Sequence, residues 1–173
     1  MNGAMDMRKT LWKIGLSSAV VLLMSTSADA QTVTQPLNVS VTIASRAQLT
    51  LSTANLVIPD ADPATVPTLT APGLTVTVGA RTASAQPITL TVVATGGDLT
   101  GTAGTIGIAN LTWATTGTGF AGTGVSNATV AQNVGTWTGS GLRAGTQTYS
   151  LPNNWAYAPG TYATSLTYTL AVP

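Results

Sequence analysis

Apolar side chains recur at every second position along much of this chain, and this pattern constrains its fold more than any other feature. In the stretch 33–43 the apolar residues of the alternating series are Val33, Leu37, Val39, Val41 and Ile43. In the stretch 162–172 they are Tyr162, Leu166, Tyr168, Leu170 and Val172, with alanine, serine and threonine between them. A period of two places alternate side chains on opposite faces of a β-strand. Both stretches are therefore predicted to be strands with one apolar face.

The same alternation returns in shorter segments between these two stretches. Apolar positions alternate over 47–51, 74–78 and 88–94. The short apolar run 56–58 precedes a loop rich in Pro and Asp at 59–72, and Val130, Val134 and Trp137 suggest one or two further short strands. Between residues 106 and 113 the apolar series changes from even to odd positions, which predicts a β-bulge near Ala109 and Asn110. Short strands separated by Gly and Pro, without helical periodicity after Gln31, are typical of a β-sandwich. We expect an all-β sandwich of about 7–9 antiparallel strands in a single domain, residues 31–173.

The first 30 residues have the pattern of a secretory signal peptide. Arg8, Lys9 and Lys13 precede an apolar run over 14–24, and small residues ending in Ala28-Asp29-Ala30 follow it. The run is too short for a permanent membrane anchor, so cleavage before Gln31 is expected, and an uncleaved anchoring helix is the alternative. The sequence predicts a secreted protein, located in the periplasm, at the cell surface or outside the cell, with no membrane span after cleavage.

The predicted mature chain has few ionisable groups. Its charged residues are Arg46, Arg81, Arg143, Asp60, Asp62 and Asp98, and it contains no His, Cys, Glu or Lys. Balanced charge gives no electrostatic basis for binding nucleic acid. Three aspartates and hydroxyl groups without an evident base argue against an enzyme. The pair Asp60 and Asp62 is more consistent with a solvated loop than with calcium, which takes six to eight oxygen ligands. We expect no catalytic residue, metal site or cofactor.

The aromatic side chains allow two interpretations. Trp113, Trp137, Trp155, Tyr149 and Tyr157 form either part of a sandwich core or a platform on which sugars stack. Large aromatics at alternating positions usually fill cores, which favours the core for Trp113 and Trp137. Trp155 and Tyr157 lie in a loop-like stretch and remain candidates for a ligand contact.

The edges of the predicted sheets have little protection against pairing with other chains. Monomeric β-proteins usually protect edge strands with Lys, other charges, Pro or bulges. Here a partner strand is one solution, and the stretch 33–43 is a suitable partner because it is apolar on one face. The alternative is that residues 33–43 form the first strand of their own domain.

Two segments of the chain resemble known surface proteins. Leu37-Asn38-Val39-Ser40-Val41-Thr42-Ile43 and the ending Pro159–Leu170 resemble the two ends of secreted fimbrial subunits of the chaperone–usher type and of related spore-coat-U-like proteins. The ending is also similar to that of WxL cell-wall-binding domains, with Tyr168 where those carry a Trp. The resemblance implies an immunoglobulin-like sandwich completed by the next subunit's N-terminal strand. The donor positions it implies are Val33, Leu37, Val39, Val41 and Ile43, although the disulfide common in pilins is absent.

These observations give an expected function and two alternatives. We expect a structural or adhesive subunit of a bacterial cell surface, self-associating or joining other surface subunits, for example in a fimbrium or pilus. A cell-wall or carbohydrate-binding module that uses Trp155 is the first alternative. An enzyme is the least favoured.

Overall fold

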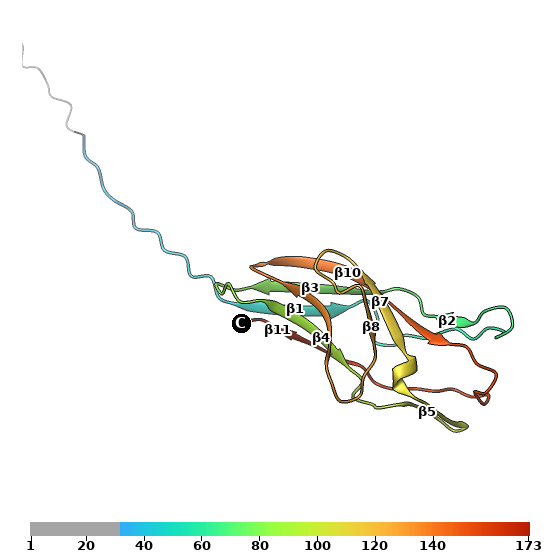
Figure 1. The fold of residues 1–173 in the computed structure, drawn as a ribbon. Coiled ribbons are helices and arrows are strands. Elements are labelled where there is room, and N and C mark those ends of the chain that lie inside the picture. Colours follow the sequence, from blue (N-terminus) through green and yellow to red (C-terminus); the bar gives the residue numbers. More distant parts are fainter. Residues whose placement is uncertain (1–31) are drawn as a thin grey trace, which may run out of the picture. The chain divides into compact units, whose positions relative to one another are not determined.

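The computed structural model describes residues 32–173, so the predicted signal peptide lies outside the described residues. Residues 41–173 form one compact unit, and residues 32–40 belong to a separate one. The unit of residues 41–173 is an all-β sandwich of antiparallel strands, as the alternation predicted (Figure 1). Nine strands lie in its two main sheets, six in one and three in the other, and the remaining two form a separate hairpin.

The larger sheet has the strand order β1-β3-β10-β7-β8, with β2 pairing with the far end of β10. These strands are β1 (Arg46–Leu51), β2 (Thr68–Thr70), β3 (Leu74–Arg81), β7 (Thr112–Thr116), β8 (Thr123–Val125) and β10 (Gly141–Pro152). The longest of them, β10, pairs with β3 along its first half and with β7 and β2 along its second half. The strand β10 therefore runs the full length of the sheet, from one end to the other.

The smaller sheet has the order β11-β4-β9, formed by β4 (Ile88–Val93), β9 (Gln132–Trp137) and β11 (Thr167–Ala171). A register shift between Leu90 and Thr91 marks an irregularity in its β4–β9 pairing. The hairpin consists of β5 (Leu99–Gly101) and β6 (Gly104–Ile106). A bridge between Thr100 and Ala163 connects the hairpin to the segment that precedes β11.

The core lies between the two sheets and is built from the alternating residues of their central strands. On β3 the buried side chains are Leu74, Val76 and Val78, and on β4 they are Ile88, Leu90 and Val92. Trp113, Trp137 and Tyr149 are also buried, which confirms the core interpretation for the two tryptophans. An aromatic platform that includes these three side chains is therefore excluded.

Several local predictions differ from the structure. The change of apolar positions near Ala109 and Asn110 is a short 3₁₀ helix, Ile108–Asn110, rather than a bulge. The β5–β6 hairpin lies in a part of the chain for which the alternation predicted no strand. The predicted C-terminal strand is shorter than expected, because its regular pairing with β4 begins only at Thr167. The stretch 33–43 is in no strand, because it has no pairing partner among the described residues.

The segment 117–126 closes one side of the sandwich. It bonds to β9 through Ala121 N–H to Val134 O (2.7 Å) and Thr136 N–H to Gly119 O (2.9 Å). It bonds to the strand β7 and the residue before it through Thr115 N–H to Gly122 O and Ser126 N–H to Leu111 O, both 2.8 Å. We call this the closed side, because one stretch of backbone is bonded to both sheets there.

Candidate functional site

The opposite side of the sandwich has two strands with free edges. Among residues 32–173, β1 pairs only with β3, and β11 pairs only with β4. No backbone hydrogen bond joins β1 to β11, although the two strands approach each other. We call this the open side. Backbone groups on its two outer edges remain available to another strand.

The inward side chains of β1 are only partly covered. Leu49 lies opposite Val78, and Leu51 lies opposite Val76, so both leucines face the core. The two valines are fully buried, whereas both leucines are half-buried. The core is therefore incomplete where β1 forms the edge.

The inward side chains of β11 have the same property. Tyr168 lies opposite Val92, and Leu170 lies opposite Leu90. Val92 and Leu90 are buried, whereas Tyr168 and Leu170 are half-buried. Similar half-buried residues flank the two strands, namely Leu56, Ile58, Leu166 and Val172. These half-buried apolar side chains form a surface along the open side that the apolar face of another strand could cover.

A hydrogen-bonded cluster joins the two sheets beside the open side. The Tyr168 hydroxyl, on β11, donates to Oε1 of Gln147 on β10 at 2.6 Å. The Tyr149 hydroxyl lies 2.7 Å from that of Tyr168 and donates to it, because the Tyr168 proton is already used. Burial raises the pKa of Tyr149 to about 12, and it also raises the pKa of Tyr168, with a further contribution from Tyr149. Both hydroxyls therefore keep their protons at neutral pH and hold β11 against β10.

This cluster was not anticipated from the sequence. Gln147 is fully buried at a position where the alternation predicts an apolar side chain, and its Nε2 has no hydrogen-bond partner within residues 32–173. The inward placement of Tyr168 does follow from the alternation of β11, but its partner does not. The strands β10 and β11 belong to different sheets, so no strand pairing indicates this contact.

The predicted strand-exchange residues are exposed. Val33, Leu37, Val39, Val41 and Ile43 have exposed fractions of 66–85 %. Residues 32–45 belong to no strand or helix. Five large apolar side chains exposed to water within eleven residues are unusual for a protein in its working state.

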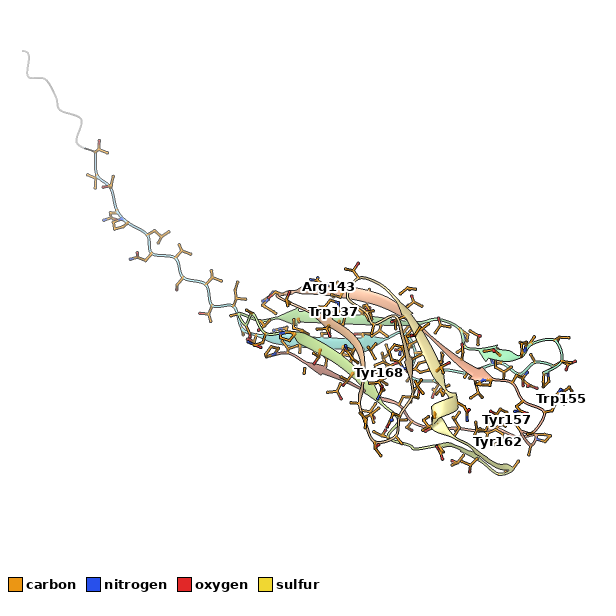
Figure 2. The ribbon with its side chains drawn as sticks, in the orientation of Figure 1. Trp137, Arg143, Trp155, Tyr157, Tyr162 and Tyr168 are labelled. Carbon is orange, nitrogen blue, oxygen red and sulfur yellow. The ribbon has the colours of Figure 1, made fainter. Side chains whose placement is uncertain are left out.

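The two loop aromatics lie at the same end of the domain (Figure 2) but differ in exposure. Trp155 is 76 % exposed, whereas Tyr157 is half-buried and packs against the core. The side chain of Asn154 orders this loop by accepting a hydrogen bond from the backbone N–H of Ala156 at 2.9 Å. Of the two predicted ligand contacts, Trp155 has a free aromatic face.

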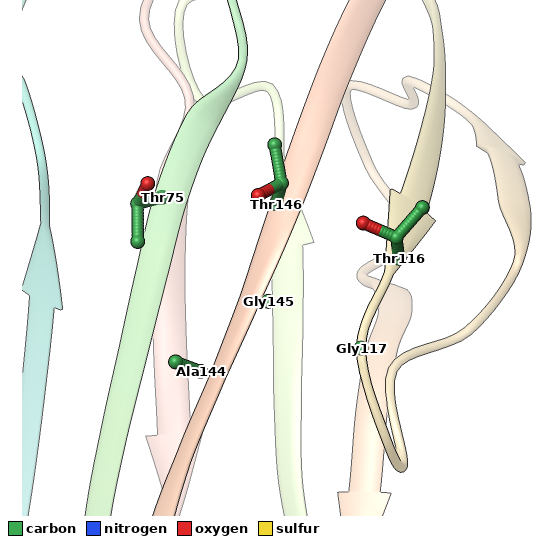
Figure 3. Close-up of a pocket in the computed structure, with 6 residues that line it drawn as sticks. All are labelled: Thr75, Thr116, Gly117, Ala144, Gly145 and Thr146. Atoms are coloured by element: carbon green, nitrogen blue, oxygen red, sulfur yellow. The ribbon is translucent and has the colours of Figure 1, made fainter.

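A hollow on the larger sheet contains no ionisable side chain among the described residues. A shallow hollow of about 230 Å³ lies across β3, β10 and β7 and is lined by Thr75, Thr116, Gly117, Ala144, Gly145 and Thr146 (Figure 3). None of these side chains is an acid or a base near neutral pH. Within residues 32–173, no three His, Cys, Asp or Glu residues come together as a metal site would require. In the same residues no helix is both long and apolar enough to cross a bilayer.

Comparisons with known proteins give no assignment: no family model, no curated protein and no solved structure matches this chain.

Proposed function

We propose that this chain is a secreted structural subunit of a bacterial cell surface, possessing an immunoglobulin-like sandwich and assembling by β-strand addition. Residues 33–43 of one copy would pair with the open side of another copy. The observation that carries the proposal is that this chain has both exposed apolar side chains in residues 33–43 and a partly covered core along the open side. In strand addition, backbone hydrogen bonds supply affinity and alternate side chains set the register.

Pairing within one chain is disfavoured by the absence of turn residues. Residues 39–54 contain no Gly, Pro, Asn or Asp, which are the residues that tight hairpins use. A segment that continues directly into β1 at Arg46 has no convenient position at which to reverse and lie beside its own edge. The same segment reaches a second copy without any reversal.

The edge strands lack the usual protection against added strands. The strand β11 contains no charged residue and no proline, and β1 has one charge, Arg46, at its first position. Such edges accept a strand readily. In an assembling subunit the missing protection is an advantage, because the edge is occupied in the assembly.

The test is to remove apolar side chains from one face of the segment. The variant Val39→Ser/Val41→Ser is expected to shift the purified, exported protein from oligomers to monomers in light scattering. The matched control is Ser40→Ala/Thr42→Ala, which changes the other face and leaves assembly intact. A synthetic peptide of residues 32–45 should bind a variant that lacks these residues. Unchanged oligomers in the first variant would reject the proposal.

A second candidate function rests on Trp155 alone. An exposed indole on an ordered loop is suited to stacking against a sugar ring. Retention on purified cell-wall polysaccharide should fall at least about tenfold for Trp155→Ala, which corresponds to about 1.4 kcal/mol. Tyr157→Phe is the control, and equal retention of all three proteins would reject a Trp155-mediated contact.

A further inference from the structure

The six charged residues after position 31 are divided between two ends of the domain by sign. Arg46 begins β1, Arg81 ends β3, and the two residues lie directly opposite each other. Arg143 lies opposite Val78, near the start of β10, and so belongs to the same end of the sheet. We call this the arginine end. Figure 2 labels Arg143 at this end and Trp155 at the other.

All three aspartates lie toward the other end. Asp60 and Asp62 flank Ala61, whose carbonyl accepts a hydrogen bond from Nδ2 of Asn153, the residue after β10 (2.9 Å). Asp98 accepts a hydrogen bond through Oδ1 from the N–H of Ile108 (2.7 Å), in the turn that leads into β7. The first residue of β7, Thr112, lies opposite Ser150, near the end of β10. We call this the aspartate end.

The two ends are electrostatically independent. The 12 residues of β10 span the sheet from one end to the other, which corresponds to roughly 37 Å of extended chain. Charges in water are screened over about 8 Å at physiological salt. The zero formal charge of this part of the chain therefore conceals a positive end and a negative end.

The arginine end is also arranged to receive an anion. Arg46 and Arg81 are both exposed, and like charges directly opposite each other on neighbouring strands are unfavourable. An acidic group placed between them would remove that repulsion. The exposed carboxylates of Asp60 and Asp62, on a loop fixed by Asn153, present such a group.

We infer that copies of this chain associate head to tail, with the arginine end of one against the aspartate end of the next. The occupant of each end is a second copy, because each end carries the charge that complements the other. Complementary charges at an interface select orientation and speed encounter more than they add affinity. The inference stands on the positions of the charges and does not require the N-terminal segment.

The orientation would determine how an added strand runs. The strand β1 starts at the arginine end, whereas β11 runs toward that end, because Ala171 lies opposite Thr89 near the start of β4. A segment that leaves the arginine end of one copy and enters the aspartate end of the next would run parallel to β1 and antiparallel to β11. Antiparallel pairing is the more stable arrangement per residue, which identifies β11 as the edge that receives the strand.

Charge exchange tests the inference in the full exported protein. Arg46→Asp/Arg81→Asp and, separately, Asp60→Arg/Asp62→Arg should each weaken self-association roughly tenfold at low salt. A variant that combines all four changes should recover self-association, because its two ends are complementary again. It should join wild-type copies poorly, because like charges then meet. The control Thr75→Asp/Thr116→Asp adds charge between the ends and should have a smaller effect.

The outcomes distinguish this inference from strand addition. If reversal at either end leaves association and its salt dependence unchanged, or if the combined variant does not recover, the head-to-tail inference is wrong. If at the same time Val39→Ser/Val41→Ser abolishes assembly, strand addition stands without it. If charge reversal weakens association as expected but Val39→Ser/Val41→Ser leaves it intact, the charge contact stands and strand addition is rejected. Thermal melting of each variant verifies that it is folded.

Discussion

The closed and open sides of the sandwich differ in how the gap between the two sheets is covered. On the closed side the chain supplies its own covering strand, and the segment 117–126 bonds to β9 on one sheet and to the β7 region of the other. On the open side, no segment of the described residues 32–173 lies between β1 and β11 in this way, and the inward side chains of both strands are half-buried. The closed side should therefore behave as part of a folded core, and the open side as a surface that another chain completes.

The largest expected effect on stability comes from a substitution that disrupts the packing of the closed side. Gly119 has φ +84°, and a Cβ added there would overlap the indole of Trp137. Gly119→Ala should lower the free energy of unfolding by about 3–4 kcal/mol, combining backbone strain with overpacking. Urea unfolding measures the change. The control is Gly122→Ala, where a Cβ would meet nothing, and a loss there as large as at Gly119 would contradict this account of the closed side.

The next effect concerns the hydrogen bonds that hold β11. Tyr168→Phe removes the donor to Gln147 Oε1 and the acceptor of Tyr149, leaving polar groups unpaired in the core. The free energy of unfolding should fall by about 1–3 kcal/mol. Tyr162→Phe is the matched control, because its hydroxyl bonds to an exposed carbonyl, that of Ala158, which water can satisfy instead. Equal losses in the two variants would show that the cluster has no special role.

A smaller effect should appear at alkaline pH. Because burial raises the pKa of Tyr149 to about 12, the folded protein retains a proton that the unfolded chain loses near pH 10. The stabilisation is therefore fully present below pH 10 and declines as the pH rises toward 12. From Tyr149 alone the loss between pH 9 and 11 is about 1 kcal/mol, and Tyr168 adds to it. Urea midpoints that rise over this range would have the wrong sign.

The smallest effect on stability is expected in the N-terminal segment. Val41 is 79 % exposed, so Val41→Ser should change the unfolding free energy of the dilute monomer by less than about 0.5 kcal/mol. The same change should weaken association at high concentration, as measured by sedimentation. A large loss of monomer stability would mean that the segment packs on its own domain.

The sequence predicts the core strands well where inward positions are apolar. Alternation located β3 and β4 because their inward residues are Leu, Val and Ile. It failed at β10, the longest strand, because two of its inward positions are Gly145 and Gln147. A search for alternating apolar residues cannot identify a strand whose inward side chain is a glutamine.

The candidate site was only half predictable. The stretch 33–43 was identified from its own alternation, but its pairing depends on a partner that a single sequence does not specify. The open side and the separation of charge arise from which strands become neighbours. Arg46 and Arg81 are 35 positions apart in the chain and become neighbours only through the β1–β3 register.

Amide hydrogen exchange of the assembled protein tests the central claim most directly. Strand addition predicts that amides of residues 33–43, together with those on the outer edge of β11, are protected in the assembly. They should exchange rapidly after dilution to monomers, while β3 and β4 stay protected in both states. Rapid exchange of residues 33–43 in the assembly would contradict the account.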